Sequence, residues 1–90
     1  MAVPYYSLQV VTPAGVVYEG KVRHARVPVE NGSVGVLANH APYVTSSAGG
    51  PLIIDEENGS QNQMNVGEGF FSVAYNKALF LTSTFQAAKT

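Results

Sequence analysis

Glycine and proline interrupt the chain along its whole length, and this spacing constrains the fold more than any other feature. The 90 residues include nine glycines and five prolines. Between these positions, no stretch of about eleven residues or more shows the apolar pattern i, i+3, i+4, i+7 of an amphipathic helix. Only the last residues of the chain leave room for a helix.

Short runs of β-branched, aromatic and aliphatic residues, each bounded by turn residues, predict strands instead. In the run 21–29 the apolar positions change from even numbers at Val22 to odd numbers at Ala25 and Val27, which predicts a β-bulge near His24. The pair Asn31-Gly32 predicts a type I′ hairpin turn. The runs cover residues 6–12, 16–18, 21–29, 34–37, 43–45, 51–55, 60–66, 70–75 and 78–82. About nine to ten short strands at this spacing are typical of an all-β, two-sheet sandwich or flattened barrel.

Length and composition narrow the classes of protein further. The length predicts one domain over residues 1–90, with its core over about residues 6–85. Hydrophobic residues make up 46% of the chain and charged residues 12%, which favours a folded chain that assembles with other proteins. The net charge of −1 argues against nucleic acid or an anionic lipid surface as the main partner.

Targeting and redox chemistry are constrained by what the sequence lacks. No apolar segment is long and uninterrupted enough to predict insertion into a membrane. Residues 1–7 have no basic flank followed by an apolar stretch, so we expect no secretory signal. The absence of cysteine excludes disulfides, thiolate metal sites and a cysteine nucleophile.

No group of residues predicts a catalytic, metal or cofactor site. His24 and His40 lack the spacing of metal ligands, and no Gly-x-Ser-x-Gly motif is present. Adjacent Glu56 and Glu57 are better explained as the solvated tip of a hairpin than as paired catalytic carboxylates.

Two groups of residues leave a choice between a structural role and a binding role. A basic group is either a solvated strand edge or a surface for an acidic partner; it consists of Lys21, Arg23, His24 and Arg26. Tyrosines could form an exposed aromatic surface in a free-standing β-sandwich module that binds carbohydrate or peptide, or they could be half-buried sheet residues; they are Tyr5, Tyr6, Tyr18, Tyr43 and Tyr75.

The segment 27–42 carries a resemblance to a known family. It reads Val-Pro-Val-Glu-Asn-Gly-Ser-Val-Gly-Val-Leu-Ala-Asn-His-Ala-Pro. It resembles the ε subunit of F-type ATP synthases, called δ in mitochondria, in which Gly-x-x-Gly-(Ile/Val)-Leu-x-x-His-(Ala/Val)-Pro is a signature. Other motifs of this chain agree with the family in order and spacing. They are residues 8–13, Tyr18-Glu19-Gly20, residues 67–73 and Asn76-Lys77-Ala78. The resemblance covers roughly residues 6–85.

This resemblance implies a fold and a function. The fold of the family domain is a sandwich of two five-stranded sheets. The implied function is that of a non-catalytic rotor subunit of the central stalk, which binds the γ subunit and contacts the c-ring to couple proton flow to ATP synthesis. The implied location is peripheral, on the cytoplasmic face of the bacterial inner membrane, or on the matrix or stromal side in an organelle.

The resemblance also assigns contact residues. It places the c-ring or the base of the stalk against Glu30, Asn31, Gly32, Ser33, Asn39 and His40, and it places γ against Thr12, His40 and Thr45. Many relatives carry a second acid where Ser33 stands, so Glu30 would have to supply an ionic contact. His40 could instead be a loop residue that holds the backbone through hydrogen bonds.

The sequence differs from longer relatives at its end. Those relatives continue into a C-terminal helical hairpin that can inhibit ATP hydrolysis and in some members binds ATP. The sequence stops at Thr90, so we expect no C-terminal helical hairpin and no nucleotide binding from it.

Overall fold

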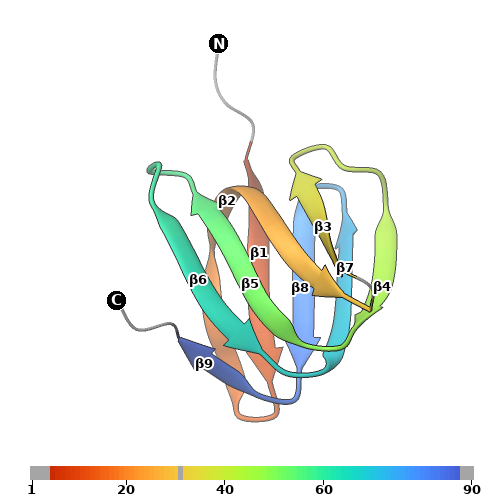
Figure 1. Cartoon of the computed structure of the whole chain (residues 1–90). Coiled ribbons are helices and arrows are strands. Elements are labelled where there is room, and N and C mark those ends of the chain that lie inside the picture. The colour runs from red at the N-terminus through yellow and green to blue at the C-terminus, as the bar shows by residue number, and fades with distance from the viewer. Residues whose placement is uncertain (1–4, 31, 88–90) are drawn as a thin grey trace.

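The computed structural model describes residues 5–30 and 32–87, and these ranges form strands and turns without a helix (Figure 1). The predicted all-β class is confirmed. The nine strands of the described residues are β1 Tyr6–Thr12, β2 Gly15–Val29, β3 Gly32–Leu37, β4 Tyr43–Ser47, β5 Gly50–Glu56, β6 Gln61–Val66, β7 Gly69–Ala74, β8 Lys77–Thr82 and β9 Phe85–Ala87.

Strand β2 belongs to both layers of the sandwich. Its first half pairs with β1, so the first sheet has the order β4-β7-β8-β1-β2. Its second half lies between β3 and β5, and the second sheet has the order β3-β2-β5-β6-β9. β1 and β8 are parallel, and all other neighbouring strands are antiparallel. Because one strand runs through both sheets, the layers form one continuous body.

The bulge predicted near His24 is present and lets β2 change sheets. The register of β2 against β5 shifts between Val22 and His24. The buried positions change there from Val22 to Ala25 and Val27. An extra residue at a bulge bends the strand and moves its apolar side chains to the other face, which keeps both halves of β2 facing the same core.

Residues 16–18 and 21–29, predicted as separate strands, form one strand of 15 residues. The predicted break at Glu19-Gly20 is wrong because both residues pair with β1. Glu19 lies opposite Gln9, and Gly20 lies opposite Leu8. The ladder therefore continues through the point where the residue types alone suggest a turn.

Gly32 lies within β3, opposite Val29, and is not a central residue of the hairpin turn. The prediction that Asn31-Gly32 forms the two central positions is wrong for Gly32 in this register. Asn31 lies outside the described residues, so its own conformation stays a prediction. The register leaves two residues between β2 and β3, a length common in tight hairpins.

The ninth strand was not covered by any predicted run. Phe85 lies opposite Val66 at the edge of β6 and packs against the core. A strand of three residues has too little pattern of its own to be recognised, and the neighbouring edge stabilises it. The tail that could have been helical is a strand as far as Ala87, and residues 88–90 lie outside the described residues.

The core lies between the two sheets and follows the alternation of their strands. Phe71 and Phe80 are cross-strand partners on β7 and β8, with ring centroids 6.3 Å apart. Tilted aromatic pairs of this kind stabilise a sheet beyond the burial of their area. The buried apolar residues are Tyr6, Leu8, Val10, Val22, Ala25, Val27, Val36, Leu52, Ile54, Met64, Val66, Phe71, Val73, Ala78 and Phe80.

Candidate partner-binding surface

The outer face of the first sheet carries apolar side chains in addition to those in the core. Val11 on β1 lies opposite Val16 on β2 and opposite Leu81 on β8. Leu81 in turn lies opposite Phe70 on β7. Because directly opposite residues share a face, these four residues form one line across four adjacent strands, which we call the apolar row. Val16, Leu81 and Phe70 are 54%, 45% and 61% exposed.

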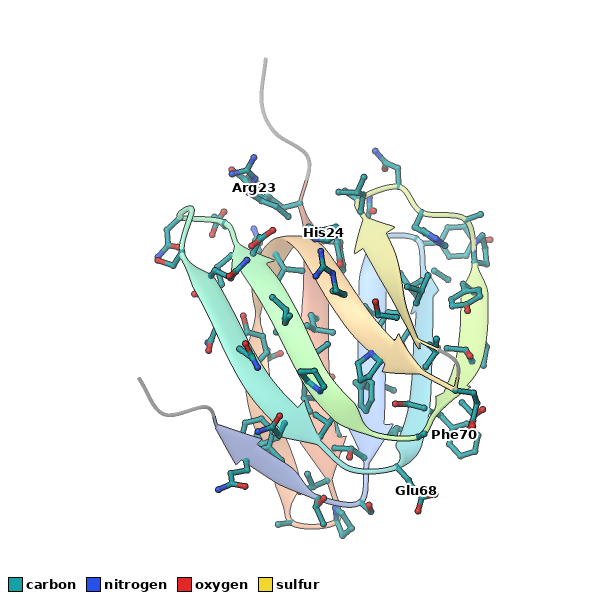
Figure 2. All side chains as sticks on the ribbon, viewed as in Figure 1. Arg23, His24, Glu68 and Phe70 are labelled. Carbon is teal, nitrogen blue, oxygen red and sulfur yellow. The ribbon has the colours of Figure 1, made fainter. Side chains whose placement is uncertain are left out.

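The apolar row continues at its β7 end to the edge strand β4. Phe70 lies opposite Ser46, and Val44 is two residues further along the same face, 74% exposed. Figure 2 shows Phe70 pointing away from the ribbon beside β4. We call the apolar row together with Val44 the apolar face.

Gly69 fixes the position of Phe70. A Cβ atom at Gly69 would overlap the carbonyl oxygen of Leu81, which is a backbone atom of the neighbouring strand. β7 can therefore approach β8 this closely only with glycine at this position. Gly69 therefore serves a close backbone approach at the start of β7.

A shallow hollow of about 310 Å³ lies beside the apolar row. Its lining includes Val11 and Leu81 from the row and Thr12 from the end of β1. Thr12 is half-buried, and its hydroxyl accepts a hydrogen bond from the Ala14 amide at 3.2 Å. Of the three residues assigned to γ by resemblance, Thr12 is the one that borders the apolar face.

The sequence contained a signal for this face that the strand prediction did not use. The predicted runs 70–75 and 78–82 contain apolar residues at consecutive positions, as in Phe70-Phe71 and Leu79-Phe80-Leu81. A strand with one solvated face alternates, whereas a consecutive apolar run is typical of a strand covered on both faces. Phe71 and Phe80 point into the core, which leaves Phe70 and Leu81 on the outside.

The other residues assigned by resemblance do not lie together. Glu30, Gly32 and Ser33 are exposed at one end of β3, and we call them the β2–β3 tip. Asn39 and His40 follow the other end of β3, in the β3–β4 loop, and this loop lies at the top of Figure 1. β3 has six residues, which at about 3.3 Å per residue separates the two groups by a strand length.

His40 is held in place by its own loop. Its Nδ1 atom is 2.7 Å from the carbonyl oxygen of Ala41, and its ring packs edge to face against Tyr43 at 5.8 Å between centroids. The backbone role considered for His40 is therefore present. The half-buried ring also borders a hollow beside Tyr75.

Thr45 lies on the inner side of β4. It is opposite the buried Phe71 and shares its face with Tyr43 and Ser47, whereas Val44 and Ser46 point outward. Its hydroxyl donates to the carbonyl oxygen of Ser46 at 3.1 Å. A partner would reach Thr45 at the edge of the sheet rather than on the apolar face.

Charged residues gather on the second sheet and at the β5–β6 turn. Nδ1 of His24 is 3.6 Å from a carboxylate oxygen of Asp55, and Figure 2 shows His24 over β2 with Arg23 pointing outward. Glu57 is exposed, as expected for a solvated tip, but Glu56 accepts a hydrogen bond from the Tyr18 hydroxyl at 2.8 Å. Burial, together with this hydrogen bond, raises the pKa of Tyr18.

The tyrosines do not share one open face. Tyr6 is buried. The Tyr5 hydroxyl donates a hydrogen bond to the carbonyl oxygen of Glu57, and the Tyr18 hydroxyl donates one to the Glu56 carboxylate. Tyr43 contacts His40, and Tyr75 lies beside the same loop. This distribution offers no shared aromatic surface for a carbohydrate. In the described part of the chain, no three His, Asp or Glu side chains are close enough together to hold a metal ion.

Comparison with known proteins places the chain in a family. The model of the ATP synthase delta/epsilon chain β-sandwich domain matches residues 5–88. The chain belongs to the ATP synthase delta/epsilon family. The resemblance of residues 27–42 is confirmed, and with it the expectation of an ATP synthase subunit that is not itself catalytic.

Relatives named ATP synthase epsilon chain differ in how much of their length the chain spans. The one from Chlorobaculum tepidum is 31% identical over 77 residues, which is 86% of this chain and 88% of the relative. The one from Anaeromyxobacter sp. strain K is 37% identical over 82 residues, which is 91% of this chain and 61% of the relative. The chain thus spans most of the first relative and less than two thirds of the second.

Two solved structures share the fold of this family member. A chain of the Euglena gracilis mitochondrial ATP synthase, in a structure with its c-ring, matches with a TM-score of 0.83 and 23% identity, covering 89% of this chain and 51% of that chain. A chain from the central stalk and c-ring of the Tetrahymena thermophila enzyme matches with a TM-score of 0.73 and 14% identity, covering 90% and 65%. In the residues that our structure describes, no helix has the length and apolar character needed to cross a bilayer.

Proposed function

We propose that this delta/epsilon family member is a rotor subunit of the ATP synthase central stalk. In this proposal the apolar face binds the γ subunit, and the β2–β3 tip contacts the c-ring. The chain would then couple proton flow to ATP synthesis by transmitting torque. In a bacterium it would lie on the cytoplasmic face of the inner membrane, and in an organelle on the matrix or stromal side.

The apolar row is the observation that supports binding to γ. A sheet that faces water on one side usually carries polar residues on that side. In this chain four adjacent strands instead carry valine, leucine and phenylalanine on the outer face. A contiguous exposed apolar patch on a small protein is typical of a protein–protein interface. γ is the partner that the family suggests for such a face.

The remaining assigned residues enter this proposal at different places. Thr12 would contact γ at the hollow beside the apolar row. Thr45 and His40 would meet γ beyond the apolar face, at the β4 edge and at the loop before β4. Asn39, which also follows β3, would lie with His40 against the base of the stalk.

The β2–β3 tip is the surface that we assign to the c-ring. Glu30, Gly32 and Ser33 are exposed there, and Asn31, the remaining assigned residue, lies outside the described residues. Glu30 supplies the negative charge of this tip. A small, polar, exposed tip suits contact with the polar loops of a ring better than the apolar face does.

Substitution of Phe70 tests the proposal. Phe70→Ala removes the largest side chain of the apolar row, and we expect it to weaken binding to purified cognate γ by about tenfold or more, because buried aromatic residues dominate interface energies. Leu37→Ala is the matched control, since Leu37 is also 61% exposed but lies on β3 in the second sheet. Titration calorimetry should show the control within about twofold of the unsubstituted chain.

Two results would count against the proposal. The first is an unsubstituted chain that does not bind γ at micromolar concentration. The second is an equal loss of affinity in both variants, which would place the interface elsewhere. Circular dichroism of both variants shows whether either change disturbs the fold.

A further inference from the structure

Three non-glycine residues of the described chain have positive φ, and all three lie at the same end of the sandwich. Asn39 has φ 64°, Tyr75 has φ 52° and Asn76 has φ 60°. Tyr75 and Asn76 are the two residues between β7 and β8, since Ala74 lies opposite Lys77. A two-residue turn with both φ values positive is a type I′ turn, in which asparagine and glycine are favoured and a bulky aromatic residue is strained.

Asparagine side chains hold this turn against the loop that precedes β4. The backbone N–H of Asn39 donates to Oδ1 of Asn76 at 2.6 Å, and Nδ2 of Asn76 donates to Oδ1 of Asn39 at 3.1 Å. This reciprocal pair joins segments that are 37 residues apart in the chain. The conformation of the β7–β8 turn is therefore fixed by a second segment as well as by its own hairpin.

The pair of asparagines presents an aromatic ring to solvent. Tyr75 is 88% exposed, more than any other large apolar or aromatic side chain among the described residues. It borders a hollow of about 460 Å³ lined by Asn39, His40, Ala41, Pro42, Tyr75 and Asn76, which we call the Tyr75 corner. None of the six is an acidic residue, lysine or arginine. Strained backbone that neighbouring structure holds in place is characteristic of sites that bind.

The Tyr75 corner is continuous with the apolar face. Phe70, Ser72 and Ala74 alternate along the outer side of β7, and Tyr75 is the next residue of the chain. Pro42 lies two residues before Val44 on the way into β4. A surface that covers Phe70 and Val44 therefore reaches the corner if it extends along β4 and β7.

The size of the apolar face argues that a partner does extend this far. Even at about 200 Å² for each whole side chain, the value for an aromatic residue, the exposed fractions of the four exposed residues of the apolar face give less than roughly 500 Å² together. A stable interface buries about 800 Å² on each partner. Tyr75 is a large exposed ring on a rigid support next to that face, and such a ring adds area at a small cost in side-chain entropy.

We propose that Tyr75 extends the γ contact proposed for His40, and that the Tyr75 corner receives an uncharged aliphatic or proline side chain of γ against the Tyr75 ring. This inference rests on the proposed function, because it takes γ as the partner. The Asn39–Asn76 pair positions the ring before γ arrives.

Three substitutions of Tyr75 and one control test this contact by calorimetric titration with purified γ. Tyr75→Phe keeps the ring and should bind within about twofold of the unsubstituted chain. Tyr75→Ala should bind about tenfold or more weakly. Tyr75→Asn should lose as much affinity as Tyr75→Ala while its urea midpoint stays equal or rises, because asparagine relieves strain at positive φ. Leu37→Ala should leave the affinity unchanged.

The outcomes separate this inference from the proposed function. Loss of affinity in Tyr75→Asn at full stability supports the corner as a contact, since a merely structural tyrosine would not give that combination. Binding of Tyr75→Ala and Tyr75→Asn equal to that of the unsubstituted chain, together with weak binding of Phe70→Ala, overturns the corner and leaves the proposed function intact. An unsubstituted chain that does not bind γ overturns both.

Discussion

Tyr6 places a hydroxyl group inside the core. The ring is 2% exposed, and the hydroxyl donates to the carbonyl oxygen of Val36 at 2.8 Å. Burial raises the pKa of Tyr6, and a backbone hydrogen bond from Ala25 offsets this only in part. The side chain thus joins β1 to the second sheet through a bond that depends on the neutral form of the phenol.

We expect Tyr6→Phe to lower the free energy of unfolding by about 1–2 kcal/mol, because it leaves a buried carbonyl without this donor. Urea denaturation followed by circular dichroism measures the change. Tyr75→Phe removes a hydroxyl from an exposed ring and should leave the urea midpoint unchanged. Equal midpoints for Tyr6→Phe and Tyr75→Phe would show that the buried bond contributes nothing net.

The same residue gives the stability a dependence on alkaline pH. In the unfolded chain tyrosine ionises near pH 10, whereas the folded chain keeps Tyr6 neutral to higher pH because its pKa is raised. The folded state therefore binds more protons above about pH 10, and stability falls as pH rises. Tyr18, whose pKa is also raised, acts in the same direction. In Tyr6→Phe the fall between about pH 10 and 12 should be shallower.

At the scale of elements, local patterns predicted the strands well and the faces less well. The bulge near His24 could be predicted because Val22 and Ala25 lie within one strand, where a change of parity is visible in the sequence. The continuity of β2 through Glu19-Gly20 could not be predicted from the local sequence, because it depends on pairing with β1. Turn residues indicate a break only where no neighbouring strand continues the ladder.

The candidate site was harder to predict than the fold for a similar reason. Because Phe70 and Phe71 are consecutive in a strand, their rings must point to opposite faces of the sheet. The sequence does not show which of these faces a partner covers. The resemblance identified Thr12, which borders the apolar face, and it grouped Glu30 with His40, which lie at opposite ends of β3. Glu30 and His40 are separated because the six residues between Gly32 and Leu37 form an extended strand. The motif lists the residues in order, but it does not give the distance between them.

Gly69→Ala tests whether the approach of β7 to β8 depends on glycine. The added Cβ would overlap the Leu81 carbonyl oxygen, and since this atom belongs to the backbone, we expect a loss of about 1–3 kcal/mol in the free energy of unfolding. Gly35→Ala is the control, because its Cβ would meet only the His24 imidazole, which can rotate away. The urea midpoint of Gly35→Ala should stay close to that of the unsubstituted chain. Equal losses in both variants would contradict the role given to Gly69.

At the scale of the whole molecule, the described residues span 37 × 30 × 25 Å, and the proposed contacts lie on different parts of this body. The apolar face occupies one side of the first sheet, and the β2–β3 tip lies at the end of β3 away from the Tyr75 corner (Figure 1). β2 runs through both sheets, so a load applied at the tip reaches the apolar face through a close-packed core. A subunit that transmits torque needs this combination of separate contacts and a stiff connection.

The separation of the contacts predicts separate effects on the two partners. We expect Glu30→Gln to weaken attachment of the preformed complex with γ to purified c-ring by about two- to fivefold at low salt, because exposed ionic contacts are worth little and are screened as ionic strength rises. Its affinity for γ should not change, whereas Phe70→Ala should lower that affinity. Glu57→Gln, at the exposed β5–β6 turn, controls for loss of one negative charge. If Glu30→Gln weakened binding to γ as much as Phe70→Ala does, the tip and the apolar face would serve one partner and the division between ring and stalk would be wrong.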